Sequence, residues 1–288
     1  MNWEEDLTGA NRICCFGADG PRIASLVPSL TETLFALGLG ERLVARTGYC
    51  IHPEGDVQRI PKVGGTKTVN LAKLRRLRPT HVLVNVDENR LETIDALRAW
   101  GDDAPEIVVT HPLAPEDNLS LLQQLATAFC RQPRVHELAA GLAASIGAEL
   151  ALTEPHGRRT RRVLYLIWHG PWMTIARDTY LSSMLARIGW HTLPDASGGH
   201  AGAGRYPKVD GDEPWLGDVD LVLLSSEPFA FHASHLQEAQ ALCPMAEVRR
   251  VDGELLSWYG ARAVPGLRYL RHLADDNTGA APLRPRSA

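Results

Sequence analysis

The sequence has few of the features that assign a chain to a special class of protein. Its five cysteines form an odd, scattered set without the spacing of a zinc finger or a disulfide framework: Cys14, Cys15, Cys50, Cys130 and Cys243. Such usage is typical of free thiols in a reducing compartment. No apolar run approaches the roughly 18 residues that a membrane-spanning helix needs. We therefore expect free thiols and no membrane span.

Positive charge is not in excess. The formal net charge is -4 at pH 7 and the sequence pI is about 6.3. Nothing in this balance favours nucleic acid or an anionic membrane as a partner. The first residues contain Glu4, Glu5 and Asp6 where an export signal would have positive charge, and no apolar segment follows them. The chain as given is therefore expected to be cytoplasmic.

The common catalytic motifs are also missing. The sequence contains no GxSxG nucleophile motif, no GxxxxGK phosphate loop and no HExxH zinc motif. The glycine-rich stretch 198–204 does not follow a strand in the manner of a dinucleotide-binding fingerprint. We therefore predict a protein that is not an enzyme and requires no cofactor.

The chain is organised around one apolar stretch, residues 133–154. Val135, Leu138, Leu142, Ile146 and Leu150 recur at spacings of three and four, which places them on one face of an α-helix. A helix of this length spans roughly 30 Å, about the width of a small domain. It is predicted to be a rigid spacer between two halves of the chain.

Strands alternate with helices on both sides of this spacer, which indicates parallel sheets wrapped by helices. We predict an α/β fold of two Rossmann-like lobes joined by one long backbone helix, with a ligand cleft between the lobes. The expected parts are an N-terminal arm at 1–21, an N-terminal lobe at 22–132, the linker helix at 133–154, a C-terminal lobe at 155–275, and a disordered tail at 276–288.

The loops that follow the strands are where ligands bind in open α/β sheets. These loops contain several aromatic rings, which suit a large, flat, partly apolar ligand, although lobe-interface core remains an alternative for each ring. The rings expected to contact ligand are Tyr49, Trp168, Trp172, Tyr206, Trp258 and Tyr259.

The same loops contain three histidines, His52, His169 and His200, and Cys50 lies two residues before His52. Neutral imidazole can bind a metal, so His52 and His169 are candidate metal ligands. No motif spacing supports this, and a solvated or hydrogen-bonded histidine is the alternative. A second hypothesis is therefore a cytoplasmic metal-binding protein or enzyme that uses these histidine and cysteine loops.

The stretch 23–32 (IASLVPSLTE), the segment Val63-Gly64-Gly65 leading to Asn70-Leu71, and the strand after Arg78-Pro79 carry a family resemblance. The sequence resembles the cobalamin and iron-chelate substrate-binding proteins of ABC importers, the helical-backbone metal receptors. The resemblance covers about residues 22–275. It implies a receptor that binds a corrinoid such as cobalamin, or another metal chelate, in the interlobe cleft. The ligand contacts that the resemblance implies are Pro28, the Tyr49 loop, Thr66, Trp172, the pair Trp258-Tyr259 and Arg262.

The resemblance also implies an ABC transporter as partner. Family members dock on the transporter through an acid in each lobe. The first-lobe position falls near Ala72, where no acid stands, whereas Asp212 or Glu213 could serve in the second lobe. The aromatic residue that cobalamin binders place in the Gly64-Gly65 loop is replaced here by Thr66 or Lys67.

Overall fold

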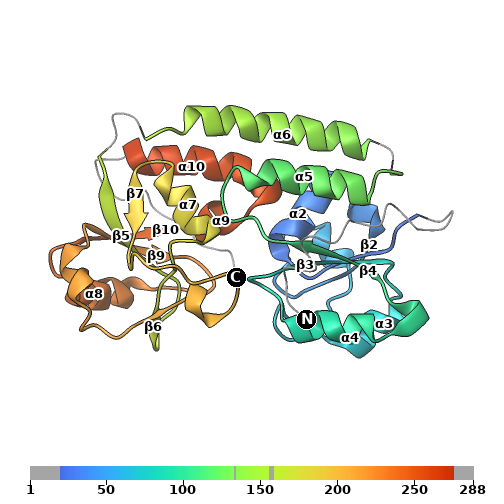
Figure 1. Ribbon diagram of the computed structural model, residues 1–288, viewed down its shortest axis with the longest axis horizontal. Helices are drawn as coiled ribbons and strands as arrows, with labels where there is room; N and C mark the ends of the chain where they lie inside the picture. Colours follow the sequence, from blue (N-terminus) through green and yellow to red (C-terminus); the bar gives the residue numbers. More distant parts are fainter. Residues whose placement is uncertain (1–19, 133, 156–158, 276–288) are drawn as a thin grey trace. The chain divides into compact units, whose positions relative to one another are not determined.

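The computed structural model describes residues 20–132, 134–155 and 159–275 of the 288-residue chain (Figure 1). Contacts divide these residues into two compact units. The first comprises the described residues up to Pro112, Glu116–Gly147 and Tyr259–Arg262, and the second comprises Leu113–Pro115, Ala148–Trp258 and the described residues from Ala263 onward. The tail expected at 276–288, and all but two residues of the expected arm, lie outside the described residues.

The first unit is built on a parallel sheet with the strand order β2-β1-β3-β4. Its strands are β1 (Ile23–Ser25), β2 (Leu43–Arg46), β3 (His81–Asn85) and β4 (Glu106–Thr110). Helices α3 (Leu71–Arg76) and α4 (Leu91–Arg98) cover one face, and α2 (Pro28–Ala36) and α5 (Asp117–Ala128) cover the other (Figure 1). Every residue of β3 is buried, as the apolar run predicts for a central parallel strand.

The second unit has a parallel sheet with the order β10-β9-β5-β7. Its strands are β5 (Arg161–Leu166), β7 (Trp190–Thr192), β9 (Leu221–Ser225) and β10 (Glu247–Val251), and a small antiparallel pair joins β6 (Trp172–Met173) to β8 (Lys208–Val209). The helices are α7 (Tyr180–Ala186), α8 (Ala233–Leu242), α9 (Gly253–Ser257) and α10 (Ala263–Asp275). Counted from β7, the strand order is the same as in the first sheet. The predicted α/β fold with two parallel sheets is confirmed.

Helix α6 (Val135–Leu152) is the helix expected at 133–154. Its predicted face is correct, because Val135, Ile146 and Leu150 are buried. Contacts assign its residues up to Gly147 to the first unit and those from Ala148 to the second.

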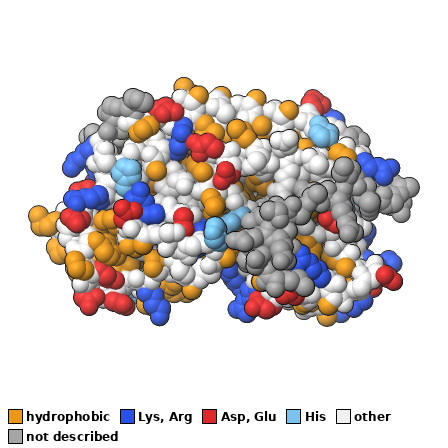
Figure 2. Space-filling model, in the orientation of Figure 1, with side chains coloured by type: hydrophobic (Ala, Val, Ile, Leu, Met, Phe, Trp, Pro, Cys, Tyr) orange, Lys and Arg blue, Asp and Glu red, His pale blue; other side chains and the backbone are white. Residues whose placement is uncertain are grey.

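Contrary to expectation, α6 meets the length and composition criterion for a membrane-spanning helix, with a mean hydropathy of 1.3 and 28% of its residues buried. Its outer surface shows few charged side chains (Figure 2). The carboxylate of Glu149 in its last turn accepts hydrogen bonds from Arg268 at 2.6 Å and Arg271 at 2.7 Å, both on α10. A single helix of this length and composition is weak evidence for a membrane span, and these hydrogen bonds fix its last turn on α10.

The sequence predicts three helix caps: Ser29 with Glu32 for α2, Asn70 for α3, and Asn89 with Glu92 for α4. Only the cap at Asn70 agrees with the structure. Asn70 caps α3 as expected, because its Oδ1 accepts a hydrogen bond from the Lys73 amide at 2.9 Å. The capping box expected at Ser29 and Glu32 is wrong, since the N-cap of α2 is Val27, two residues earlier, and has no side-chain cap. The Glu32 carboxylate instead pairs with Arg262 at 2.7 Å. Asn89, expected to cap α4, binds neighbouring loops, as described below.

Candidate ligand-binding site

Each sheet changes winding direction between its first and third strands, and ligands bind outside the carboxyl ends of the strands at such a switch point. In the first sheet the switch point lies between β1 and β3, which pair in parallel register. In the second it lies between β5 and β9. The loops leaving these four strands are therefore the first place to look for ligand-binding groups.

Asn89 ties together the loops at the switch point of the first unit. Its Nδ2 donates to the Leu26 carbonyl at 3.2 Å and to the Thr66 carbonyl at 3.0 Å. The turn containing Thr66 is thereby fixed beside the exit of β1, where Pro28 is buried in the first turn of α2. Of the expected contact residues in this unit, Pro28 and Thr66 lie together at this edge.

Among the described residues of the first unit, Tyr49 is the exposed aromatic ring. It follows β2 and is 63% exposed. A Cβ added to Gly65 would lie 3.2 Å from the Tyr49 ring, so the absence of a side chain at Gly65 lets the ring lie against this turn. An exposed ring held in this way presents a flat apolar surface at the carboxyl edge of the sheet.

Charged residues that were not among the expected contacts follow β3 and β4. Lys67 Nζ donates to the Asp87 carbonyl at 2.7 Å, and His111 Nε2 lies 3.5 Å from Asp87 Oδ2. Glu88 accepts a hydrogen bond from the Tyr259 hydroxyl at 3.3 Å. Because the acidic pair Asp87-Glu88 directly follows a buried strand, its position at this edge could have been inferred from the sequence.

Tyr259 and Arg262 belong to a short segment that packs on the first unit. Tyr259 is only 6% exposed, and burial raises the pKa of its hydroxyl well above the usual value. The guanidinium of Arg262 makes two parallel hydrogen bonds of 2.7 Å with Glu32. Both expected contact residues therefore have structural partners in this unit, and their role toward a ligand stays a prediction.

Trp168 and Trp172 lie in a tight turn after β5, closed by hydrogen bonds between Trp168 and Met173 and between Ile167 and Met173. Trp168 is 41% exposed and packs edge-on against Phe229, with ring centroids 5.4 Å apart. Trp172 is half-buried against the core of the unit. Because Phe229 follows β9, this pair marks the switch point of the second sheet.

The other expected aromatic contacts of the second unit differ in exposure. Trp258 is 7% exposed, and its Nε1 donates to Glu227 Oε1 at 2.7 Å. Tyr206 is half-buried after the glycine-rich stretch. That stretch is held by Asp178, which accepts hydrogen bonds from the amides of Gly198 at 2.8 Å and Gly199 at 3.0 Å. Trp168 is thus the most exposed of these three rings.

The two acids expected to dock a transporter, Asp212 and Glu213, differ in exposure and in hydrogen bonding. The carboxylate of Glu213 accepts the backbone amides of Asp210 and Gly211, each at 2.8 Å, and these bonds hold the pKa of Glu213 below its usual range. Asp212 is exposed. Any docking through an acid of this loop would therefore fall to Asp212, which stays a prediction.

The candidate metal ligands His52 and His169 belong to different units. Among the described residues, no group of three His, Cys, Asp or Glu side chains is placed to hold a metal ion. His52 is half-buried after Cys50, whose thiol is fully buried and has its pKa raised by burial. His169 instead lies 2.9 Å from Glu238. A site for a bare metal is not favoured by this arrangement.

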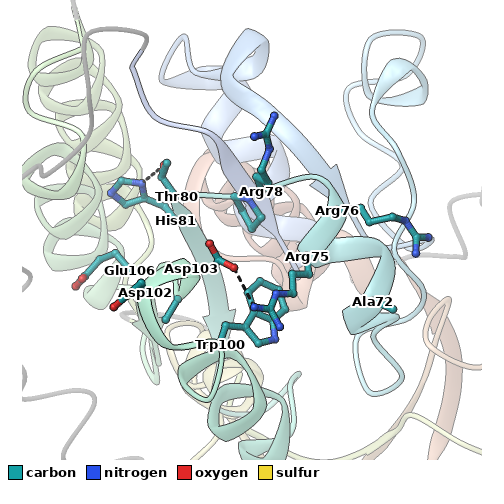
Figure 3. A pocket seen from close by; sticks show the side chains of 12 residues that line it. Ala72, Arg75, Arg76, Arg78, Thr80, His81, Trp100, Asp102, Asp103 and Glu106 are labelled. Atoms are coloured by element: carbon teal, nitrogen blue, oxygen red, sulfur yellow. Dashed lines mark hydrogen bonds and ion pairs between the residues drawn. The ribbon is translucent and has the colours of Figure 1, made fainter.

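A pocket of about 870 Å³ lies at the opposite edge of the first sheet, where β3 and β4 begin (Figure 3). The guanidinium of Arg75 lies over the Trp100 ring at 5.6 Å and pairs with Asp103 at 2.9 Å. His81 in its wall is buried, which lowers its pKa to about 4. This pocket is at the amino ends of the strands, whereas ligands of open α/β sheets bind outside the carboxyl ends.

A family model described as periplasmic binding protein matches residues 23–240. The chain belongs to the periplasmic binding protein family. Over 80 residues it is 34% identical to a vitamin B12-binding protein of Yersinia pestis (strain Pestoides F). That match spans 28% of this chain and 28% of the relative, and a Yersinia pseudotuberculosis (serotype O:3) relative matches equally.

Solved structures show the same fold. The periplasmic vitamin B12 binding protein BtuF of Vibrio cholerae has a TM-score of 0.72 at 20% identity, covering 89% of this chain and 98% of that one. A periplasmic heme-binding protein from Pseudomonas aeruginosa has a TM-score of 0.71 at 20% identity, covering 92% and 95%. The family consists of solute-binding proteins that serve ABC transporters, and its relatives include vitamin B12-binding and heme-binding proteins.

Proposed function

We propose that this chain is a substrate-binding receptor for a corrinoid, or for another metal chelate of similar size, and not an enzyme. The observation that carries the proposal is an exposed aromatic ring in the ligand-edge loops of each unit, Tyr49 in the first and Trp168 in the second. Large exposed rings held by local packing are suited to stacking on a flat macrocycle. The short match to vitamin B12-binding proteins supports the same ligand class.

The charges of the second unit favour a ligand without carboxylates. At the switch point of its sheet, the loops directly after β5 (167–171) and β9 (226–232) contain Glu227 but no lysine or arginine, whereas Arg177, farther along the chain, pairs with Asp195 at 3.4 Å. Heme carries two propionate carboxylates, and their burial requires cations or hydrogen-bond donors that replace the lost water. The side chains of the corrin ring are neutral amides. Acidic side chains accept hydrogen bonds from such amides. We therefore place corrinoids before heme as ligands.

The first test is a titration of the purified chain with aquocobalamin and, separately, with hemin, followed by absorbance and calorimetry. We expect saturable binding of one corrinoid per chain, tighter than about 100 μM, which corresponds to about -5.5 kcal/mol. Hemin is expected to bind more weakly. If neither compound binds tighter than this limit, the proposal is wrong.

Truncation of the exposed rings identifies the site. Trp168→Ala and Tyr49→Ala should each weaken corrinoid binding by about 1–2 kcal/mol, or about 5- to 30-fold, because each removes a ring that the ligand would cover. Trp100→Ala, at the opposite edge of the first sheet, is the control and should leave affinity unchanged. Loss of affinity in the control alone would move the site to that edge.

Coupling to an ABC transporter is part of the proposal, because the family serves such transporters. The test is whether an ABC transporter reconstituted in vesicles with this chain takes up corrinoid, and whether Asp212→Ala reduces uptake without changing corrinoid affinity. The cytoplasmic location expected from sequence stays a prediction. Cell fractionation tests it, since a pool found outside the cytoplasm would contradict it.

A further inference from the structure

The pocket at the amino edge of the first sheet has no part in the proposed corrinoid site. It lies within the first unit, and its volume of about 870 Å³ is in the range of sites that take small ligands. Arginines, acids and a tryptophan line it together (Figure 3). A cavity with so many charged groups is suited to a ligand that itself carries charge.

The charges of this pocket are divided between two sides. The basic side is formed by the end of α3 and the turn after it, with Arg75, Arg76 and Arg78. The acidic side is formed by the 3-10 helix Gly101–Asp103 and the start of β4, with Asp102, Asp103 and Glu106. Figure 3 shows Asp102 and Glu106 on the side away from the arginines. The pocket is therefore dipolar.

Two cations of the basic side have no partner. Arg75 pairs with Asp103 at 2.9 Å and lies over the Trp100 ring at 5.6 Å. Among the described residues, the guanidinium groups of Arg76 and Arg78 make no hydrogen bond or ion pair, and both side chains are exposed. A guanidinium can make two parallel hydrogen bonds with a carboxylate. Arg76 and Arg78 are therefore available to a carboxylate of a ligand.

Arg78 occupies a position where the backbone favours glycine. It follows the C-cap of α3, Leu77, and has a φ of +46°, in the left-handed region that glycine adopts most readily. Arg22 fixes this turn, because its guanidinium donates to the carbonyls of Leu77 at 2.6 Å and Arg78 at 3.0 Å. An arginine is less favourable than glycine in such a conformation. Its side chain is therefore expected to have a role that the turn itself does not need.

The two sides of the pocket restrict the class of ligand. A polyphosphate would meet Arg76 and Arg78, but Asp102 and Glu106 would repel it. A peptide can present a carboxylate to the basic side and an ammonium or guanidinium group to the acidic side, and an aromatic side chain can lie against the half-buried Trp100. A peptide with charges of both signs therefore fits this pocket better than a simple anion.

We propose that this pocket binds a peptide segment of a partner protein, and that the segment carries both acidic and basic residues. Its carboxylates pair with Arg76 and Arg78, and its basic groups pair with Asp102 and Glu106. Trp100 packs against the side chain between them. This site goes beyond the proposed corrinoid function and does not depend on it, because it lies at the opposite edge of the sheet.

The probes are two fluorescein-labelled peptides of about eight residues with a central tyrosine, in which a pair of glutamates either precedes or follows a pair of lysines. Fluorescence anisotropy at low salt measures their binding to the full chain. We expect one order of charges to bind tighter than about 100 μM. Replacing its glutamates or its lysines by glutamine should weaken binding at least about 5-fold, because each replacement removes the ion pairs with one side.

Paired variants test the basic side. Arg76→Gln/Arg78→Gln should weaken binding about 5- to 30-fold and remove the difference between the glutamate and glutamine peptides, with corrinoid affinity unchanged. The control Arg90→Gln/Arg250→Gln removes two exposed arginines that lie elsewhere and changes the net charge equally. It should leave peptide affinity unchanged. An equal loss in both pairs would show a net-charge effect and refute the site.

Arg78→Gly separates a binding role from a structural one. Glycine adopts a positive φ more readily, so this variant should raise the melting temperature by about 1–4 °C while it weakens peptide binding about 3- to 5-fold. A lower melting temperature would instead show that the arginine side chain supports the fold.

The remaining outcomes are distinct. If neither peptide binds tighter than the stated limit, or if the glutamate and glutamine peptides bind equally, the peptide site is wrong. If pyrophosphate binds tightly and displaces the peptide, the pocket is an anion site and the proposal is likewise wrong. Each of these results leaves the corrinoid titration as it is, so failure of the peptide site and failure of the receptor function are distinguished.

Discussion

The substitution Gly260→Ala tests how the segment Tyr259–Arg262 is held on the first unit. Gly260 has a φ of +78°, and a Cβ placed there would lie 2.0 Å from Thr33 Oγ1. The Gly260 amide donates to the fully buried Asn118 Oδ1 at 2.5 Å, and the next amide, of Ala261, donates to Thr33 Oγ1 at 3.0 Å. A methyl group at this position cannot fit without displacing these contacts.

The size of the effect follows from two contributions. A non-glycine residue at positive φ costs about 1–2 kcal/mol. Loss of the hydrogen bond to Asn118 leaves a buried polar group unsatisfied, which costs about 1–3 kcal/mol more. We therefore expect a loss of about 2–5 kcal/mol, which at about 2–4 °C per kcal/mol lowers the melting temperature by about 4–20 °C.

Gly55→Ala is the matched control, because Gly55 has a φ of +88° and nothing lies within 4 Å of the Cβ position. It should lose only the conformational contribution, about 1–2 kcal/mol. Differential scanning calorimetry of both variants measures the difference. Removing the hydroxyl and one methyl group in the double variant Thr33→Ala/Gly260→Ala should recover part of the loss. Equal shifts for Gly260→Ala and Gly55→Ala would refute the packing argument.

Two further predictions concern buried charge. Glu149→Gln should destabilise the chain by about 2–3 kcal/mol in a urea titration, because Arg271 is left without its carboxylate while the more exposed Arg268 regains water. The control is Glu154→Gln, which removes an exposed carboxylate that pairs with Arg187 at 3.2 Å. It should change stability by at most about 1 kcal/mol. His81, with its pKa lowered to about 4 from 6.5, stabilises the fold above pH 6.5 and loses that contribution as pH falls from 6.5 toward 4. The stability difference between the unmodified chain and His81→Gln should therefore shrink over that range, and a constant difference would contradict the assignment.

Much of the fold follows from local sequence patterns. The continuous apolar run at β3 predicts its strand because a central parallel strand is buried on both faces. The spacing of Val135, Ile146 and Leu150 predicts α6 because a helix buries one stripe, which recurs every three or four residues. Strand β7 (Trp190–Thr192) was not predicted, because three residues are too few to show the alternation of apolar and polar side chains that marks a strand. The pairing of Glu32 with Arg262 was missed because it joins positions 230 residues apart, whereas the expected cap used only neighbours.

The site was predictable in part. The rule for strand ends selected Tyr49 and Trp168, whose exposure now distinguishes them from the buried Trp258 and Tyr259. Sequence could not provide that distinction, because burial depends on which distant segment covers a ring. The contact between His169 and Glu238 could not be predicted either, since it depends on where α8 packs against the loop after β5.

The repeated strand order explains how such distant residues come to share one edge. In each sheet the first and third strands leave side by side, so Asn89 reaches the Leu26 carbonyl across 63 positions, and Trp168 meets Phe229 by the same geometry in the second unit. The cores require only apolar runs, which leaves the loop residues free to differ among proteins with this fold. We therefore expect ligand identity to depend on the few side chains at these edges, and here those are exposed rings and acids.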